Sequence, residues 1–306
     1  MTKRSVMPFA PLWAALAMTL MLTGCAEPQS GSSQSAQPTA TAETAYPAFE
    51  KPGISVQLWS VKDEVKADFV GTLQALADMG FDGVEFAGDF GPYQNNPTGL
   101  KAKLAELGLA VSGAHVGFDA LRGDKLVATA LFHQQLGTPY VIVPWDERAF
   151  AADTVDLVAK ELTVIAERLA PYGLRVGYHN HAQEMADYGD ITFWQYIASN
   201  TPESVVLQQD VGWTLVAEKD PVAMVKAYPG RTLTTHFKAP EYETPKGTPI
   251  LGQDGINWLP IYQATAAVGG AKWVVLEQEQ YPNGLTPLEA VAATKQGFDN
   301  IITAGN

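Results

Sequence analysis

Cysteine is nearly absent from this chain. The 306 residues include a single cysteine, Cys25, which stands well before the part of the sequence in which apolar and polar segments alternate. That later part can contain no internal disulfide, so a large hydrophobic core has to stabilise it. Residues 53–306 are numerous enough to form one large domain or two small ones.

Basic residues are scarce as well. The chain has 20 Lys+Arg against 33 Asp+Glu, which gives a formal net charge of −13 at pH 7. Removal of Lys3 and Arg4 with an export signal would leave 18 − 33 = −15. A surface of this charge repels polyphosphate, and we therefore expect no nucleic-acid partner.

The chain begins with an apolar run, from about Pro11 to Leu22, that is too short to cross a membrane comfortably. The two basic residues precede it and Leu22-Thr23-Gly24-Cys25 ends it, which is typical of an export signal. The last four residues resemble the bacterial lipobox, which implies cleavage before Cys25 and acylation of its thiol. The alternative is an unmodified structural cysteine. We expect an exported protein, lipid-anchored in the periplasm or on the surface of a bacterial cell.

A segment without apolar periodicity separates this signal from the rest of the chain. Residues 26–52 are rich in Ser, Gln, Thr, Ala and Pro, a composition typical of a disordered tether. The sequence thus predicts a signal peptide (1–24), a flexible tether (25–52) and a single domain (53–306). Membrane attachment would come from lipid on Cys25 rather than from a basic patch.

From residue 53 onward, apolar segments rich in β-formers alternate with amphipathic segments of helical period. The predicted strands are Ile54–Trp59, Gly83–Phe86, Ala110–His115, Tyr140–Val143, Leu174–His179, Val205–Asp210, Thr232–Phe237 and Trp273–Glu277. The predicted helices are Asp68–Met79, Gly99–Leu107, Lys125–Leu136, Asp153–Leu169, Ile191–Ser199, Pro221–Tyr228, Trp258–Val268 and Pro287–Ile302. Four helical segments are followed by a glycine suited to a left-handed cap: Gly80, Gly108, Gly137 and Gly173.

Eight strands, each followed by a helix, predict a single-domain α/β fold, the (β/α)8 TIM barrel. Tyr140–Val143 and Val205–Leu207 are apolar throughout, as are parallel strands buried on both faces. The alternative is an open, doubly wound sheet. Such a sheet usually carries a glycine-rich phosphate loop after an early strand, and the sequence shows none there.

Ionisable and amide residues stand repeatedly at the predicted strand ends, where the active site of a barrel lies. In chain order they are Gln57, Glu85, His115, His179, His181, Asp210, His236, Lys238, Glu277 and Glu279. Packing hardly explains this pattern, because burying such groups unpaired is unfavourable. A divalent metal would satisfy several of them together. Two histidines, one aspartate and one glutamate suit Mn²⁺, Zn²⁺, Co²⁺ or Fe²⁺ better than Ca²⁺.

The most informative stretch is Gly177-Tyr178-His179-Asn180-His181-x-x-Glu184. Side chains of a strand alternate between its faces, so His179 and His181 point one way and Asn180 the other. Two imidazoles aimed at one spot indicate a metal site or a proton-transfer site. The alternative is a pair of surface or core-capping histidines.

Together with Asp210-Val211-Gly212-Trp213, His236-Phe237-Lys238 and Val275-Leu276-Glu277-Gln278, this stretch resembles the xylose isomerase-like barrel superfamily. Its members are often labelled sugar phosphate isomerases/epimerases, and the resemblance covers residues 53–306. It implies one divalent ion held by His179, Asp210, His236 and Glu277. It also implies a sugar isomerase or epimerase that works by α-proton abstraction through an enediolate.

One position departs from the epimerases of that superfamily, which have a glutamate where this chain has His179. Their two glutamates act as paired acid and base, and a symmetrical transfer of this kind is not expected here. The His-Asn-His-x-x-Glu variant resembles a subgroup that also includes keto-sugar lyases and hydratases. We assign α-proton removal to His181 or Glu184, and stabilisation of the enolate oxygen to Lys238.

The remaining strand-end residues are interpreted as substrate contacts. They are Gln57, Glu85, His115, Trp213 and Glu279. Trp59 and Trp145 would complete an aromatic wall for a sugar ring, with ordinary core positions as the alternative. The other assignments have alternatives as well. His115 would orient a loop, and Glu184 would cap a helix or pair with an arginine. Lys238 would be a solvated surface residue, and Glu279 would only tune the metal without contacting substrate.

We expect the substrate to be an unphosphorylated keto-sugar, because exported proteins seldom meet sugar phosphates and the acidic charge repels them. A 3-keto-glycoside lyase or hydratase of the same family is one alternative, and its ketone would come from a partner sugar oxidoreductase. A second alternative is a non-catalytic carbohydrate-binding lipoprotein. A nuclease of the related endonuclease branch would need several metals and a basic face, which the charge disfavours.

Overall fold

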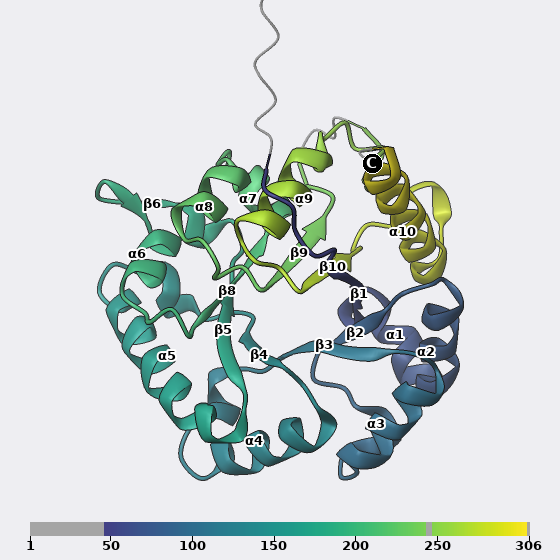
Figure 1. Cartoon of the computed structure of the whole chain (residues 1–306), viewed down its shortest axis with the longest axis horizontal. Helices are drawn as coiled ribbons and strands as arrows, with labels where there is room; N and C mark the ends of the chain where they lie inside the picture. Colours follow the sequence, from purple (N-terminus) through teal and green to yellow (C-terminus); the bar gives the residue numbers. More distant parts are fainter. Residues whose placement is uncertain (1–45, 243–246, 305–306) are drawn as a thin grey trace, which may run out of the picture. The chain divides into compact units, whose positions relative to one another are not determined.

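The computed structural model describes residues 46–242 and 247–304. Eight parallel strands close into a barrel in the order β1-β10-β9-β8-β5-β4-β3-β2, and helices surround it (Figure 1). This closure confirms the (β/α)8 prediction and excludes the doubly wound sheet. The predicted signal peptide, Cys25 and most of the tether lie outside the described residues. Within the described ranges, no helix is both long and apolar enough to cross a membrane.

The elements follow the predicted alternation closely. The barrel strands are β1 (Gly53–Gln57), β2 (Gly83–Phe86), β3 (Ala110–His115), β4 (Tyr140–Val143), β5 (Arg175–His179), β8 (Val206–Asp210), β9 (Thr234–Lys238) and β10 (Trp273–Glu277). The helices are α1 (Lys62–Ala67), α2 (Phe69–Asp78), α3 (Pro97–Glu106), α4 (Lys125–Leu136), α5 (Val155–Leu169), α6 (Phe193–Ser199), α7 (Val211–Val216), α8 (Pro221–Ala227), α9 (Trp258–Ala267) and α10 (Pro287–Ala304). A short antiparallel hairpin, β6 (Asp187–Tyr188) and β7 (Ile191–Thr192), forms a separate sheet.

Where boundaries differ from the prediction, local hydrogen bonds explain the difference. The first strand stops at Gln57 rather than Trp59, because the Gln57 side chain accepts a hydrogen bond from Trp59 N and starts a 3-10 helix. Helix α6, predicted to start at Ile191, begins after Thr192, which forms a capping box with Gln195. The hairpin and the short helices α1 and α7 were not predicted. The four predicted glycine caps have φ between 73° and 88°, as expected.

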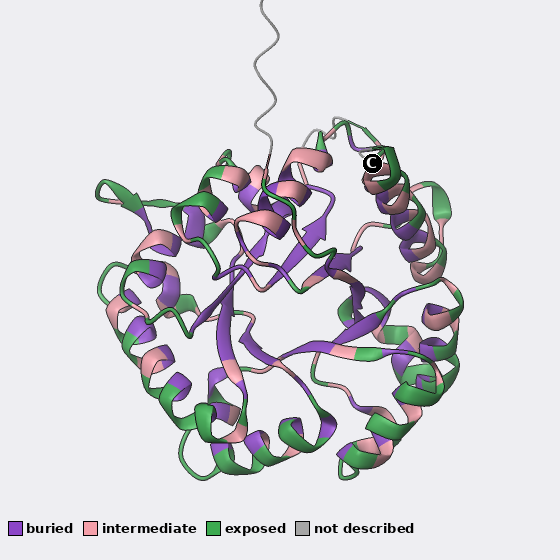
Figure 2. Cartoon of the chain, in the orientation of Figure 1, coloured by how far each residue is buried: buried purple, intermediate pink, exposed green. Residues whose placement is uncertain are grey.

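The strands are buried and the outer helix faces are exposed (Figure 2). Two apolar clusters pack between the barrel and its helices and include the fully buried Trp194, Trp258 and Phe298. Inside the barrel, glycine makes room for neighbouring strands: a Cβ on Gly177 would lie 2.5 Å from Ile142 Cδ1. The Ile142 side chain therefore packs directly against the β5 backbone at Gly177.

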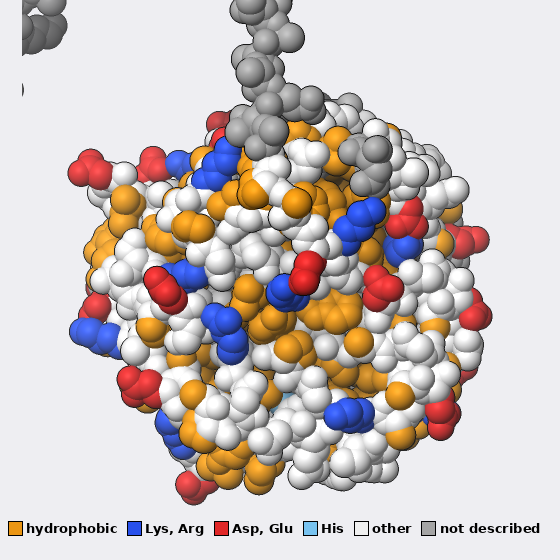
Figure 3. Space-filling model, in the orientation of Figure 1, with side chains coloured by type: hydrophobic (Ala, Val, Ile, Leu, Met, Phe, Trp, Pro, Cys, Tyr) orange, Lys and Arg blue, Asp and Glu red, His pale blue; other side chains and the backbone are white. Residues whose placement is uncertain are grey.

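Figure 3 shows one face of the molecule, viewed down its shortest axis. Hydrophobic side chains gather over its middle, and most of the visible acidic side chains lie round its rim. Lys and Arg side chains are scattered over this face rather than gathered into a patch. Nucleic-acid binding needs a basic patch to contact the phosphates, and this face offers none among the described residues.

Candidate active site and metal centre

Strand register places polar residues, most of them predicted, next to one another at the carboxyl end of the barrel. Gln57 pairs with Glu85, His179 with Gln208, Asp210 with His236, and Glu277 with Lys238. Successive βα units thus deliver polar side chains to one rim, as the fold requires.

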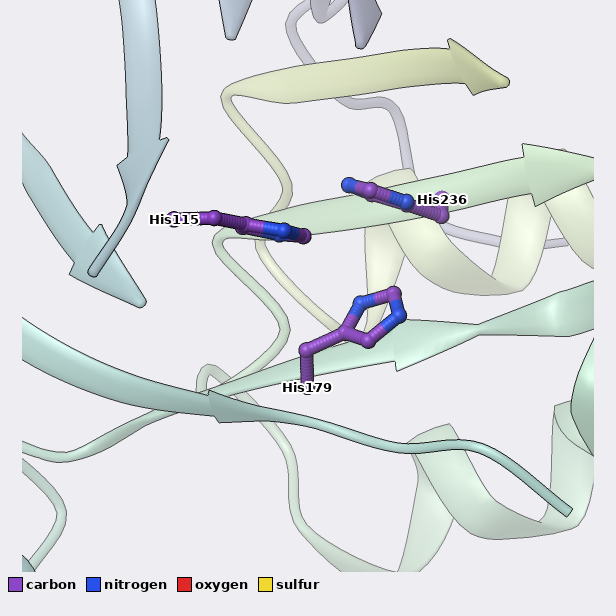
Figure 4. Close-up of side chains that lie close together, drawn as sticks. All are labelled: His115, His179 and His236. Carbon is purple, nitrogen blue, oxygen red and sulfur yellow. The ribbon is translucent and has the colours of Figure 1, made fainter. Parts of the chain in front are cut away.

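Three histidines from separate strands meet at the centre of this rim (Figure 4). The rings of His115 and His236 stack with an interplanar angle of 8° and centroids 5.2 Å apart. His179 meets His236 edge to face, with centroids 4.5 Å apart. The ends of the third, fifth and seventh barrel strands therefore bring their histidines together.

A second group at the same place combines Asp210, His236 and Glu277, whose ligand atoms lie within 4.8 Å of one another. His236 Nδ1 lies 2.7 Å from Glu277 Oε2 and 4.0 Å from Asp210 Oδ2, and His179 Nε2 is 3.9 Å from the same Asp210 oxygen. Among the described residues, Asp210 Oδ2 is buried without a hydrogen-bond partner. A buried, unpartnered carboxylate oxygen facing two imidazole nitrogens suits a divalent cation.

Glu85 lies one layer below these histidines and is fully buried. Its carboxylate accepts hydrogen bonds from Gln208 Nε2 at 2.7 Å and Gln57 Nε2 at 3.3 Å, and contacts His236 Nε2 at 3.0 Å. His115 Nε2 approaches to 3.2 Å. Glu85 and Gln57 therefore position the histidines. They had been predicted as substrate contacts, but neither lines the cavity.

Gln208 links Glu85 to His179 and His115 and thereby fixes the tautomer of both histidines. Because its amide NH₂ donates to Glu85, its carbonyl Oε1 faces His179 Nδ1 at 3.1 Å and His115 Nε2 at 2.8 Å. Both ring nitrogens must donate to that oxygen. His179 then keeps a lone pair on Nε2, the atom that faces Asp210. Gln208 was not predicted, although it shares a strand face with Asp210.

The pKa values follow from burial and from these contacts. Burial raises the pKa of Asp210 to about 7, although Lys238 and His236 oppose the shift. Burial opposes ionisation of Glu277 too, but the hydrogen bond from His236 and the charge of Lys238 lower its pKa to about 2. Burial lowers the pKa of His236, yet the Glu85 charge and the Glu277 hydrogen bond outweigh it and raise the value to about 10. A proton on His236 Nδ1 therefore occupies the position that a metal would take.

His181 borders a cavity of about 530 Å³, together with Trp59, Trp145, His179, Glu277 and Glu279. Its ring meets Trp145 edge to face at 4.8 Å and lies 5.7 Å from Trp213. Burial lowers the pKa of His181 to about 4, so the imidazole is neutral at pH 7. Within the described chain its buried Nδ1 has no hydrogen-bond partner.

Glu184, the other candidate for the base, is fully buried, and its carboxylate is bonded to protein groups. Its Oε2 accepts from His181 N at 2.8 Å, and its Oε1 accepts from the Tyr178 hydroxyl at 2.9 Å. Burial raises the pKa of its carboxyl. Both oxygens are engaged, and the structure places Glu184 as the residue that positions His181.

The buried Lys238 forms an ion pair with the partly exposed Glu279 beside the cavity. Lys238 Nζ donates to Glu279 Oε2 at 2.7 Å and lies 4.5 Å from the centre of the Trp213 ring. Burial lowers the pKa of Lys238, but the surrounding carboxylates Glu277, Asp210 and Glu279 raise it above its ordinary value. Lys238 is a permanent cation here. Its charge offsets part of the carboxylate cluster.

Asn180 faces away from the cavity, as strand alternation predicted. Its Oδ1 accepts from Asp210 N at 2.9 Å, and its Nδ2 contacts Asp210 O at 3.4 Å. Asp210 Oδ1 in turn accepts from Trp213 N and caps α7. These bonds fix one Asp210 oxygen and leave the other directed at the histidines.

Comparison with known families agrees with this geometry. The sequence profile described as "Xylose isomerase-like TIM barrel" matches residues 73–301. The chain belongs to this family. The structure of a sugar phosphate isomerase/epimerase from Parabacteroides distasonis matches 79% of this chain and 96% of its own, with a TM-score of 0.66 and 25% identity. An L-ribulose 3-epimerase structure, with a TM-score of 0.64 and 18% identity over 83% and 96% of the two chains, shares the fold.

Two curated relatives are dehydratases. An inosose dehydratase from Lactiplantibacillus plantarum is 31% identical over 160 residues, which are 47% of this chain and 53% of that protein. A 3-dehydroshikimate dehydratase from Pseudomonas putida is 28% identical over 198 residues, 61% of this chain and 30% of that protein. The chain thus spans about half of the first relative and less than a third of the second.

Proposed function

We propose that this xylose isomerase-like barrel removes the proton α to the ketone of an unphosphorylated keto-sugar with the help of one divalent metal, and that loss of a β-substituent is the favoured outcome. The convergence of Asp210, His236 and Glu277 beside a cavity bordered by His181 carries the proposal. The two curated dehydratases support the elimination.

The residues present fit a divalent ion. His179 Nε2, Asp210 Oδ2, His236 Nδ1 and Glu277 would hold it, and Glu85 and Gln208 orient the two imidazoles. When bound, the ion would supply Lewis-acid polarisation of the ketone. Two carboxylates and two imidazoles are ligands typical of Mn²⁺, Zn²⁺, Co²⁺ or Fe²⁺.

His181 is the residue to which we assign the α proton. Trp145 and Trp213 hold its ring from two sides, and Glu184 fixes its backbone N–H. The electron pair of the substrate C–H bond enters the enolate, and an imidazole nitrogen of His181 receives the proton.

Elimination is completed by the same base. The β C–O bond breaks as the enolate electrons form the new C=C bond, and the departing oxygen takes the proton back from His181. Epimerisation would need a second acid or base on the opposite face of the substrate. Of the two carboxylates at the cavity wall, Glu277 would be bonded to the metal and Glu279 is bonded to Lys238. These bonds favour elimination over epimerisation.

Isomerisation of a ketose is the second candidate, because one base can also return the proton to the neighbouring carbon. The sugar phosphate isomerase/epimerase structure supports it. A phosphate on the substrate is disfavoured, because neither Lys nor Arg is among the described residues that line the cavity.

The test is incubation of the metal-loaded protein in heavy water with free ketoses, ketose phosphates and 3-keto-glycosides, followed by NMR. Elimination gives an enone and a released group, and isomerisation gives a moved carbonyl with deuterium. His181→Asn should abolish both, whereas Gln183→Asn, an exposed change in the same segment, should not. A wild-type protein that binds these sugars but exchanges no deuterium would instead be a carbohydrate-binding protein.

A further inference from the structure

A second cavity of about 630 Å³ lies beside the first, between α4 and the segment that leads into α3. The segment from Gly88 to Pro97 forms one wall, and the exposed side of α4 forms the other. Both volumes fall within the roughly 300–1,000 Å³ of small-molecule sites. The proposed reaction needs only the inner cavity, where His181 and Glu277 lie.

The two cavities meet at three residues, Gly88, His115 and Gly117, which line both of them. Two of the three lack a side chain, and a Cβ built on Gly88 or Gly117 would meet no atom within 4 Å. Gly88 has a φ of +89°, which favours glycine there. His115 is therefore the one side chain at the junction, and it is held by Gln57 and Gln208.

The lining of this outer cavity has the chemistry of a carbohydrate site. Phe90 and Phe132 supply aromatic surface, with ring centroids 4.6 Å apart. Gln94, Asn95 and Gln135 supply amide groups that can both donate to and accept from hydroxyls. Among the described residues that line it, none is Lys, Arg, Asp or Glu. A phosphate, a carboxylate or an amine would find no counter-charge there.

We propose that the outer cavity binds a second, uncharged sugar ring, joined by a glycosidic bond to the keto-sugar in the inner cavity. This inference rests on the proposed function and names its substrate class: a keto-disaccharide rather than a free ketose. The junction at Gly88, His115 and Gly117 is where the glycosidic linkage passes from one cavity to the other. The second ring contributes affinity and sets the position of the first.

The experiment compares wild type with Ala128→Trp. Ala128 lies on the exposed side of α4 and lines the outer cavity alone, so an indole there fills that space and leaves the inner cavity open. The matched control is Ala102→Trp, the same change at an exposed position of α3 outside the lining. The substrates are 3-ketoglucose and a panel of 3-keto-disaccharides that differ in linkage.

For wild type we expect kcat/KM on the best disaccharide to exceed that on 3-ketoglucose by about tenfold or more, which is about 1.4 kcal/mol. Ala128→Trp should lose about tenfold on the disaccharide with 3-ketoglucose unchanged, and Ala102→Trp should change neither. Equal rates on all substrates, or an Ala128→Trp variant that affects both classes alike or neither, would overturn the proposal.

Failure of the proposed function has a different signature, namely no turnover of any substrate by wild type. Calorimetric titration of the same sugars then tests the second site by itself. Disaccharide binding that is tighter than 3-ketoglucose binding, and weakened by Ala128→Trp alone, supports the outer cavity as a sugar site. Equal affinity for both sugars, or the absence of binding, overturns it.

Discussion

The carboxylate of Glu85 offers the sharpest test of how the centre is built. Glu85→Gln keeps the shape of the side chain but replaces one oxygen by an NH₂ group. In the wild type the two oxygens face Gln208 Nε2, Gln57 Nε2 and His236 Nε2, all at 2.7–3.3 Å. An NH₂ group at either position meets another donor, so at least one hydrogen bond is replaced by a repulsive contact.

Rotation of the Gln208 amide would relieve that repulsion but would pass it on to the histidines. Its NH₂ would then face His179 Nδ1 and His115 Nε2, which now donate to its carbonyl. His179 would have to move its proton to Nε2, the nitrogen that faces Asp210. The lone pair required for a metal ligand would be lost.

Two magnitudes follow. Loss of a buried charge with its hydrogen bonds should reduce the free energy of unfolding of the metal-free protein by about 3 kcal/mol, and the melting temperature by roughly 6–12 °C. Disturbance of the groups that orient metal ligands should weaken divalent-metal binding by about 10–100-fold. Urea unfolding in EDTA, followed by tryptophan fluorescence, gives the first value, and calorimetric metal titration gives the second.

The matched control is Glu167→Gln, an exposed position on α5 where the same change should alter stability by less than about 0.5 kcal/mol. If Glu85→Gln has the same free energy of unfolding and the same metal affinity as this control, Glu85 does not organise the histidines. Stability lost with metal affinity unchanged would show that Glu85 supports the barrel interior but leaves the tautomer of His179 untouched.

Three further outcomes are expected. Asp210→Asn removes the buried, unpartnered oxygen of the centre and should lower metal content by tenfold or more and abolish turnover, as measured by plasma emission spectrometry and by deuterium exchange. Burial lowers the pKa of His133 from 6.5 to about 4, so the folded state favours the neutral ring and loses stability as pH falls below 6.5. Between pH 7 and 5, urea unfolding of wild type should lose about 2 kcal/mol more than that of His133→Asn. Cys25→Ser should move the protein expressed in a bacterium from the detergent phase to the aqueous phase, with loss of lipid mass in mass spectrometry.

Each of these has a result that contradicts it. Full metal content in Asp210→Asn would remove the aspartate from the ligand set. Equal pH dependence of wild type and His133→Asn would mean that the ring is already charged or solvated in the folded protein. An unmodified Cys25 in the mature wild-type protein would exclude the lipid anchor, and with it the proposed attachment to the periplasmic or outer surface of a membrane.

The barrel fold and the location of the site could both be predicted from the sequence, because both follow from the periodicity of apolar and polar residues. Apolar strands that end on His115, His179, Asp210, His236 and Glu277 meet at one rim in any barrel of this type. Strand alternation also put Lys238 on the face of His236, and the structure extends β9 to include it. These inferences need only the strand period and the common direction of parallel strands.

Contacts between strands could not be read in the same way. Gln208 is an ordinary polar residue in the sequence, and its role appears only when register brings Glu85 and His179 to its two ends. Glu184 was predicted as an alternative to His181 as the base. A single 3-10 turn, Gln183–Met185, instead turns its carboxylate back onto His181 N and Tyr178. Hydrogen-bond direction within such a turn has no periodic signature.

His179, at the end of β5, affects both the charge of the proposed ligand set and the number of bases in the centre. A glutamate at position 179 would give the proposed ligand set three carboxylates, whereas His179 leaves two, Asp210 and Glu277. Two negative charges neutralise a dication in a buried site, where a third would be costly unless another cation paired with it. An imidazole bound through Nε2 and hydrogen-bonded through Nδ1 has no nitrogen left to accept a proton. In the proposed reaction, proton transfer therefore falls to His181, two residues beyond the end of β5, and a centre with one base is suited to elimination rather than to epimerisation.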